Sequence, residues 1–155
     1  MIESFSVRWK VYVNVYVKDG RVLKVEFSNR PTRDCISSET TERLRLDLIE
    51  YFEGCEVDFR KYEVLMNSSE FVRSVLNVVR EIPYGVVKTY GEIAKMMRTS
   101  PRAVGRALKL NPSPIIVPCH RVVGANGIGG FSRGVWIKME LLKLELRDRI
   151  GSLGV

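Results

Sequence analysis

The sequence predicts an α+β fold, with a small sheet domain in residues 1–66 followed by a mainly helical domain in residues 67–155. Apolar and polar residues alternate from Val7 to Lys18, which is the period of a strand with one buried face. After position 67, apolar residues recur at helical spacing behind capping residues. Neither period continues between Tyr62 and Asn67, so we place the domain boundary there.

The first elements predicted are two strands joined by a tight turn. The apolar members of the first strand are Val7, Trp9, Val11, Val13, Val15 and Val17. Asp19-Gly20 has the residue types of a two-residue hairpin turn. The returning strand carries Val22, Val25 and Phe27, so a sheet opens the chain.

A helix is expected after a polar loop through Pro31 and Cys35. Ser37 or Ser38 can cap its start, and Gly54 is placed to end it. Its apolar residues are Leu44, Leu48, Ile49 and Phe52. The first half therefore predicts a small α+β unit.

The second half begins with another amphipathic helix. Asn67 can cap it, with Glu70 at the spacing of a capping box, and the helix should end near Pro83. Its expected buried stripe is Phe71, Val72, Val75, Leu76 and Val79.

Two short helices then follow with only a few residues between them. Thr89 and Glu92 have capping-box spacing and open the first, and Ser100 with Pro101 begins the second. This arrangement predicts a helix-turn-helix.

The second of these helices has a core face, a basic face and a surface with little bulk. The core face is formed by Val104 and Leu108, and the basic face by Arg102, Arg106 and Lys109. The surface with little bulk is formed by Ala103, Gly105 and Ala107. A helix with small side chains can approach a nucleic-acid backbone closely, and its N-terminus favours phosphate. Close packing between helices is the alternative explanation of the same small residues.

Positive charge is concentrated in the second half of the chain. The net charge is +7, but residues 1–66 hold 11 Lys/Arg against 12 Asp/Glu, whereas residues 67–155 hold 14 against 6. No acidic residue occurs between Ile93 and Met139, a stretch that contains Lys95, Arg98, Arg102, Arg106, Lys109, Arg121, Arg133 and Lys138. The bias favours a polyanionic partner, although an evenly solvated basic surface would produce it too.

The cysteine pattern and hydropathy favour a cytoplasmic protein. The chain has no apolar stretch long enough to cross a bilayer and no signal-peptide core. Cys35, Cys55 and Cys119 form no CxxC pair, so the pattern argues against a structural zinc site and no metal is expected. A disulfide between Cys35 and Cys55 is a minority interpretation outside a hyperthermophile.

One apolar, proline-bounded segment brings together a thiol and the chain's single imidazole, Cys119 and His120. A buried thiol is mostly protonated at neutral pH and needs a base. Neighbouring side chains on an extended segment point apart, so we expect a water molecule between them. Glu145, on a helical stretch of residues 135–146, could orient the imidazole. Taken singly, each residue could equally be structural.

Residues 118–122, Pro-Cys-His-Arg-Val, resemble the active-site motif of the O6-alkylguanine-DNA alkyltransferases, also called methylated-DNA–protein-cysteine methyltransferases. The similarity extends upstream through Asn111-Pro112-Ser113-Pro114 and the Arg102–Gly105 helix, and downstream through residues 127–134 to Glu145. Most of residues 67–147 is covered. For the first half the resemblance implies only a variable sheet domain with a ribonuclease-H-like fold.

The resemblance implies direct DNA repair: an alkyl group moves, once and irreversibly, from O6 of a flipped-out guanine in double-stranded DNA to the protein. Cys119 would be the nucleophile, His120 its base through water, and Glu145 the residue that orients His120. Tyr90 would donate a proton or hydrogen bond to the departing guanine. Asn111 would bridge the helix-turn-helix to the active-site segment.

The remaining implied roles concern DNA and the base pocket. Arg102 would fill the gap left by the flipped nucleotide. Contacts with DNA are expected from Arg102, Ala103, Gly105, Arg106, Thr89 and Ser100, and pocket walls from Pro114, Val122, Ser132 and Phe131. No cofactor is implied, and a monomer is expected.

Two residues depart from the family pattern, and two other functions compete with alkyl transfer. Phe131 stands where many members have tyrosine, and Arg133 is bulky where some carry smaller residues, so the accepted size of alkyl group is left open. A non-reactive sensor of alkylguanine is disfavoured because such relatives lack the cysteine. A cysteine hydrolase would leave the basic helix-turn-helix unexplained.

Overall fold

The computed structural model describes residues 1–147, which divide into two compact units. The first contains Met1–Met66 with Pro112–Ile116, and the second contains Asn67–Asn111 and the described residues from Val117 onward. Strands dominate the first and helices the second, so the α+β class is confirmed. The expected division into one domain at residues 1–66 and a second at residues 67–155 stays a prediction. Residues 112–116 pack with the first unit, and 148–155 lie outside the described residues.

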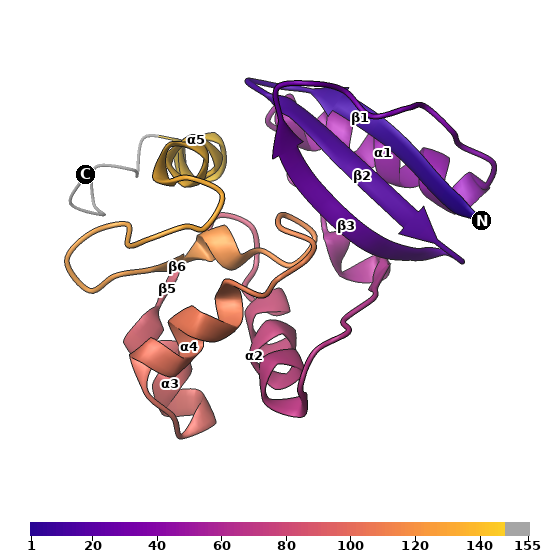
Figure 1. The fold of residues 1–155 in the computed structure, drawn as a ribbon. Coiled ribbons are helices and arrows are strands. Elements are labelled where there is room, and N and C mark those ends of the chain that lie inside the picture. Colours follow the sequence, from indigo (N-terminus) through magenta and orange to yellow (C-terminus); the bar gives the residue numbers. More distant parts are fainter. Residues whose placement is uncertain (148–155) are drawn as a thin grey trace. The chain divides into compact units, whose positions relative to one another are not determined.

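The first unit is built on a sheet in the order β1 (Ile2–Arg8), β2 (Tyr12–Lys18), β3 (Arg21–Ser28) and β4 (Glu63–Val64), with only β4 parallel to its neighbour. Figure 1 shows β1, β2 and β3 side by side. The single strand expected through residues 7–17 is wrong. Trp9 donates its N–H to the Val11 carbonyl at 2.9 Å, and the chain reverses there. The alternation of apolar and polar residues continues without a break through the turn, so the sequence pattern gives no sign that the chain reverses there.

The hairpin between β2 and β3 is confirmed. Asp19 and Gly20 both have positive φ, at 51° and 78°, and Lys18 pairs with Arg21. Two left-handed residues match the twist of the flanking strands, which is why Asp-Gly favours this turn.

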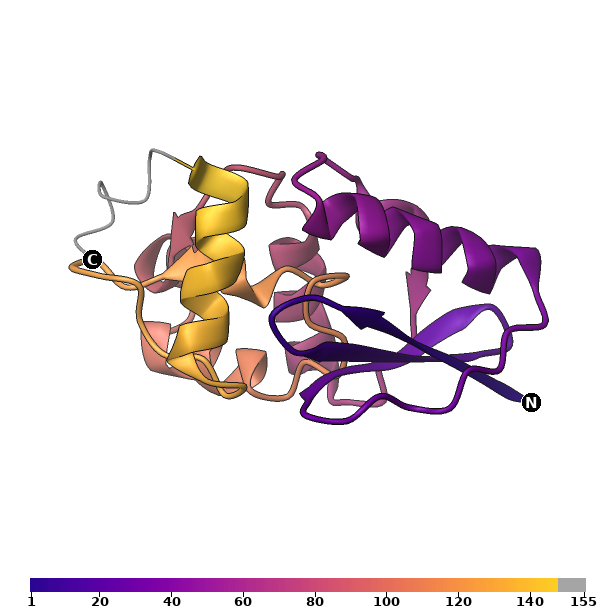
Figure 2. The ribbon, with the colours of Figure 1, turned by 90° about the horizontal axis from the view of Figure 1, so that it is seen from above.

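Helix α1 (Glu39–Phe52) covers one face of the sheet (Figure 2). Leu44 and Leu48 are buried as expected, whereas Ile49 is only half-buried. Of the two candidate caps, Ser38 performs the role, since its side chain accepts from the Thr41 N–H. A short 3-10 turn, η1 (Phe59–Lys61), leads into β4.

A buried carboxylate ties β1 to the start of α1. Glu3 is 6% exposed and accepts hydrogen bonds from the N–H groups of Ser37 and Ser38 at 2.7 Å each and from the Thr41 hydroxyl at 2.7 Å. Burial alone would raise the pKa of Glu3, but these bonds lower it to about 2. The helix N-terminus is therefore satisfied by an anion from a neighbouring strand.

The second unit starts with α2 (Glu70–Arg80), whose cap differs from the expected one. Ser69, not Asn67, accepts from the Val72 N–H. Phe71 is 41% exposed and lies outside the buried stripe, because the stripe of this helix is formed by Val72, Val75, Leu76 and Val79.

The helix-turn-helix is confirmed as α3 (Tyr90–Met97) and α4 (Pro101–Leu108), which lie against each other (Figure 1). Thr89 and Glu92 form the expected capping box, and Ser100 caps α4. Between the helices, Arg98 adopts a left-handed conformation with φ 55°.

Two short strands and a last helix complete the second unit. β5 (Lys88–Thr89) pairs in parallel with β6 (Val122–Val123), which brings the start of α3 beside the segment that follows Cys119. The expected helix at residues 135–146 is confirmed as α5 (Val135–Leu146). Within residues 1–147, no helix has the length and apolar character needed to cross a bilayer.

Candidate functional site

Cys119 opens a 3-10 turn, η2 (Cys119–Arg121), directly before β6. The extended conformation expected for this segment is wrong. Arg121 donates its N–H to the Pro118 carbonyl at 3.0 Å, which closes the turn, and such a bond leaves no periodic signal in a sequence. Successive side chains of a 3-10 turn leave the backbone about a third of a turn apart, so Cys119 and His120 still point in different directions.

The thiol of Cys119 lines a cavity of about 510 Å³ within the second unit, although only 4% of the residue is exposed. The walls come from Pro101, Arg102, Gly105, Leu108 and Lys109 on or next to α4, from Gly130, Phe131 and Ser132, and from Tyr90. This volume falls in the range of small-molecule sites, so a single nucleobase fits it.

The surroundings keep the thiol protonated at rest. Burial raises the pKa of Cys119, whereas a hydrogen bond from Asn111 and the positive charges of Arg133 and Lys138 oppose this rise. A neutral thiol is a weak nucleophile. The site therefore needs a base, as the sequence predicts.

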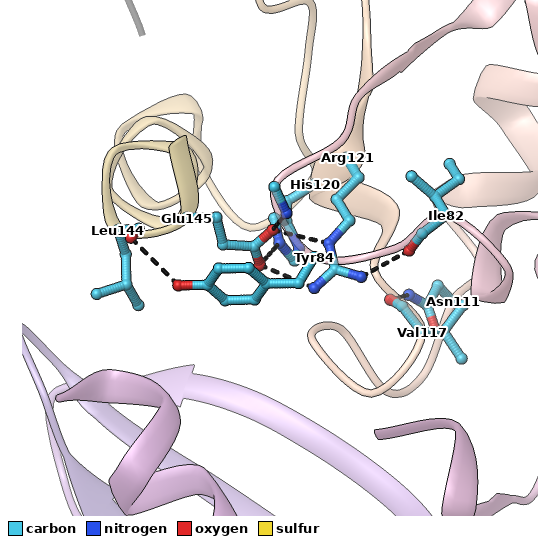
Figure 3. Close-up of polar contacts among 9 residues, drawn as sticks. Ile82, Tyr84, Asn111, Val117, His120, Arg121, Leu144 and Glu145 are labelled. Carbon is cyan, nitrogen blue, oxygen red and sulfur yellow. Dashed lines mark hydrogen bonds and ion pairs between the residues drawn. The ribbon is translucent and has the colours of Figure 1, made fainter. Parts of the chain in front are cut away.

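His120, which follows Cys119 in the chain, lies against Glu145, and Arg121 joins them (Figure 3). Nε2 of His120 is 2.6 Å from one oxygen of Glu145. Arg121 donates to the other oxygen at 2.8 Å and to the Ile82 carbonyl at 2.7 Å. All three charged or polar side chains are buried, so the carboxylate is held by a fixed set of donors.

These contacts determine which imidazole nitrogen is available. Burial lowers the pKa of His120, with Glu145 acting against it, so the resting ring is neutral. Burial would raise the pKa of Glu145, but His120 and Arg121 hold it far below the usual range. The ring therefore donates a hydrogen bond from its Nε2–H to the Glu145 carboxylate, and Nδ1 has no hydrogen-bond partner among the described residues.

Asn111 joins the end of α4 to the approach to Cys119. Its side-chain amide donates to the Val117 carbonyl at 2.9 Å, and its own carbonyl accepts from Arg133. The bridging role that the family resemblance implies for Asn111 stays a prediction, and these two contacts support it.

Tyr90 faces the cavity at the N-terminus of α3. Its hydroxyl donates to the Gly130 carbonyl at 3.3 Å, and burial raises its pKa, with a further rise from Cys119. Gly129 lies against the ring: a Cβ at this position would come within 2.8 Å of Tyr90 Cε2. The loop after β6 thus fixes the tyrosine.

Two cations that the charge pattern assigns to a basic surface are buried. Arg121 is 6% exposed and Lys138 is fully buried. For Lys138 the sequence does indicate burial. At helical spacing it shares the face of α5 that carries Leu141, Leu142 and Glu145. Arg121 has no comparable signal, because its partners come from distant segments.

The expected DNA-contacting residues occupy varied positions. Arg102 and Arg106 are exposed on α4, and only Arg102 lines the cavity. The hydroxyls of Thr89 and Ser100 cap the two helices. Ala103 and Gly105 are half-buried on α4. Contact of these residues with DNA stays a prediction.

The expected pocket residues are also divided. Phe131 and Ser132 line the cavity. Val122 and Pro114 do not: the Val122 carbonyl accepts from Lys138, and Pro114 belongs to the first unit. Their implied contacts with a base stay predictions.

The other cysteines play no part in this arrangement. Cys35 and Cys55 are exposed free thiols, without a disulfide between them. Residues 1–147 contain no group of three or more His, Cys, Asp or Glu side chains that could hold a metal ion.

Comparison with known proteins identifies the family. Residues 70–147 match the model of the 6-O-methylguanine DNA methyltransferase DNA-binding domain. The methylated-DNA–protein-cysteine methyltransferase of Archaeoglobus fulgidus is 43% identical over 148 residues, which cover 91% of this chain and 97% of the relative.

Solved structures agree in fold. The O6-methylguanine-DNA methyltransferase of Pyrococcus kodakaraensis has a TM-score of 0.72 at 30% identity, covering 94% of this chain and 99% of that one. Mycobacterium tuberculosis OGT, solved in complex with DNA, has a TM-score of 0.75 at 28% identity, covering 93% and 92%. This chain therefore belongs to the methylated-DNA–protein-cysteine methyltransferase family.

Proposed function

We propose that this protein repairs alkylated DNA by moving the alkyl group from O6 of guanine, in double-stranded DNA, onto the sulfur of Cys119. The observation that carries the proposal is the position of this thiol. Cys119 lines a base-sized cavity beside the second helix of a helix-turn-helix, and the residue that follows it, His120, forms a buried pair with Glu145. The cavity supplies the access that the reaction requires.

The damaged nucleotide must leave the duplex, because O6 inside the base stack is out of reach of a side chain. Flipping costs a few kcal/mol, which contacts between basic residues and phosphates offset. Arg102, exposed in the first turn of α4 and lining the cavity, is placed to fill the vacated position. Gly105 leaves the adjacent wall without a side chain.

Activation of the thiol follows from the hydrogen-bond pattern. Nδ1 of His120 accepts the Cys119 proton through a water molecule, since Nε2 already faces Glu145. The ring then becomes an imidazolium whose charge is balanced by the Glu145 carboxylate. Glu145 keeps its negative charge throughout, because its pKa lies far below neutrality.

Transfer is a displacement at the alkyl carbon. A bond forms from Cys119 Sγ to this carbon while the bond to O6 breaks, and the electron pair stays on the guanine. Tyr90, at the cavity wall, donates to the developing guanine anion. The product is a thioether, which these residues offer no means of reversing, so each molecule acts once.

We also propose that the protein works as a monomer in the cytoplasm. The three free thiols suit a reducing compartment. Size-exclusion chromatography with light scattering tests the monomer, and fractionation of the source cells tests the location.

The decisive experiment mixes the protein with a duplex that contains one O6-methylguanine and maps the modified peptide by mass spectrometry. The Cys119 peptide should gain the mass of one methylene group, at most once per molecule. Cys119→Ala should bind the duplex without being modified, whereas Cys35→Ala and Cys55→Ala should react normally. Repeated turnover would indicate a hydrolase or demethylase, and binding without modification would indicate a sensor.

A further inference from the structure

Lys138 is a buried cation on the inner face of α5. Its ammonium group donates to the carbonyls of Val122 at 2.6 Å and Gly130 at 3.0 Å and to the Tyr90 hydroxyl at 3.4 Å. The residue is fully buried, and no carboxylate in residues 1–147 pairs with it. Three neutral acceptors satisfy its protons but leave its charge uncompensated.

Holding this charge costs free energy. Burial lowers the pKa of Lys138 to about 8, and a negative charge on Cys119 would raise it again. An apolar side chain of the same length would fill this space without the penalty. A buried, unpaired cation beside a reaction cavity therefore points to a function for the charge.

The contact with Tyr90 indicates which function. Burial raises the pKa of Tyr90, so its phenol is by itself a poor acid for a leaving guanine. An ammonium group 3.4 Å from the phenol oxygen stabilises the phenolate that forms when the proton is given away. The same cation lies 5.5 Å from the centre of the tyrosine ring.

We propose that Lys138 is a positioning residue for alkyl transfer, acting through Tyr90: it fixes the phenol and returns a proton to it. This inference rests on the proposed function. As the bond from the alkyl carbon to O6 breaks, the guanine anion takes the Tyr90 proton, and Lys138 gives one proton to the phenolate and becomes neutral. The Cys119 proton ends on His120, so all protons are accounted for.

Lys138→Gln tests this, because it keeps two N–H donors and removes the charge. Lys143→Gln on the same helix is the matched control, since Lys143 is largely exposed. Two single-turnover rates are measured for each protein: methyl transfer from a duplex with O6-methylguanine, and alkylation of Cys119 by iodoacetamide. Iodide leaves without a proton, so the second rate reports on the thiol alone.

We expect Lys138→Gln to slow methyl transfer by about 100-fold, the usual size of a general-acid effect, and to slow iodoacetamide alkylation by less than about tenfold. Lys143→Gln should change neither rate. In a double-mutant cycle, adding Lys138→Gln to Tyr90→Phe should slow transfer by no more than about threefold further, because both changes remove one pathway.

The role of Lys138 would be overturned if Lys138→Gln slowed methyl transfer and iodoacetamide alkylation by the same factor. It would also be overturned if the rate losses of Lys138→Gln and Tyr90→Phe multiplied in the double variant. Lys138→Met provides the same comparison if Lys138→Gln does not fold, and circular dichroism of each variant monitors folding. Failure of the proposed function is a separate result, since the unmodified protein would then transfer no methyl group in the same assay.

Discussion

Nε2 of His120 lies 2.6 Å from Glu145, so this contact decides which nitrogen of the imidazole is available for the proposed reaction. With Nε2 bonded to the carboxylate, Nδ1 is the ring nitrogen left to accept the Cys119 proton that the proposed function requires. The same carboxylate holds Arg121. Orientation of the base and stability of the surrounding core therefore depend on one side chain.

Glu145→Gln should impair both. The amide removes the charge that stabilises an imidazolium and leaves Arg121 buried without an anion, so we expect transfer to slow by about 100-fold or more and stability to fall by about 3 kcal/mol. Single-turnover repair assays and urea denaturation measure the two effects. Glu140→Gln on the same helix is the control, and an unchanged repair rate in Glu145→Gln would refute the assigned role.

Glu3 should make stability depend on acid. Its pKa is about 2 when folded against an ordinary value of 4.5, so its contribution is fully present above pH 4.5 and is lost as the pH falls toward 2. We expect Glu3→Gln to cost about 2 kcal/mol at pH 7, with the difference from the unmodified protein shrinking below pH 4.5. Denaturant unfolding of both proteins between pH 2 and pH 7 measures this difference in stability. Glu56→Gln, at an exposed position, should show no such convergence.

Gly105→Ala should separate stability from DNA binding. A Cβ at this position meets no protein atom within 4 Å, and alanine favours a helix interior by about 1 kcal/mol, so the free protein should become more stable. The added methyl group would occupy the face proposed to approach DNA, and affinity for duplex should fall. Thermal unfolding and fluorescence anisotropy test the two parts. Gly91→Ala, on α3 and away from the cavity lining, should leave affinity unchanged; tighter binding by Gly105→Ala would contradict the proposed interface.

Gly129→Ala should displace Tyr90. The residue has φ 76°, and its Cβ would come within 2.8 Å of the tyrosine ring, so the ring or the loop must move. We expect a loss of at least about 1 kcal/mol in stability and of about tenfold in transfer rate. Gly127→Ala meets no atom within 4 Å and serves as the control. Normal transfer by a folded Gly129→Ala protein would show that the position of Tyr90 is not critical.

The sequence by itself determined the features that arise within a few residues. Thr89 with Glu92 and Ser100 with Pro101 set the starts of α3 and α4, and Asp19-Gly20 set the hairpin between β2 and β3. Such bonds join atoms close along the chain, so residue type and spacing suffice. The family resemblance adds Cys119, His120 and Glu145 as a set, and the structure brings the last two into direct contact.

Only the tertiary structure decided that Arg121 lies inside and which oxygens hold the charges of Arg121 and Lys138. Arg121 and Lys138 count as basic surface in any composition, yet they are buried because carbonyl and carboxylate oxygens from distant segments converge on them. The turn at Trp9 and the 3-10 turn at Cys119 are likewise closed by hydrogen bonds that leave no period in the sequence. Burial of a charge is a property of its three-dimensional surroundings, and these exist only once the chain has folded.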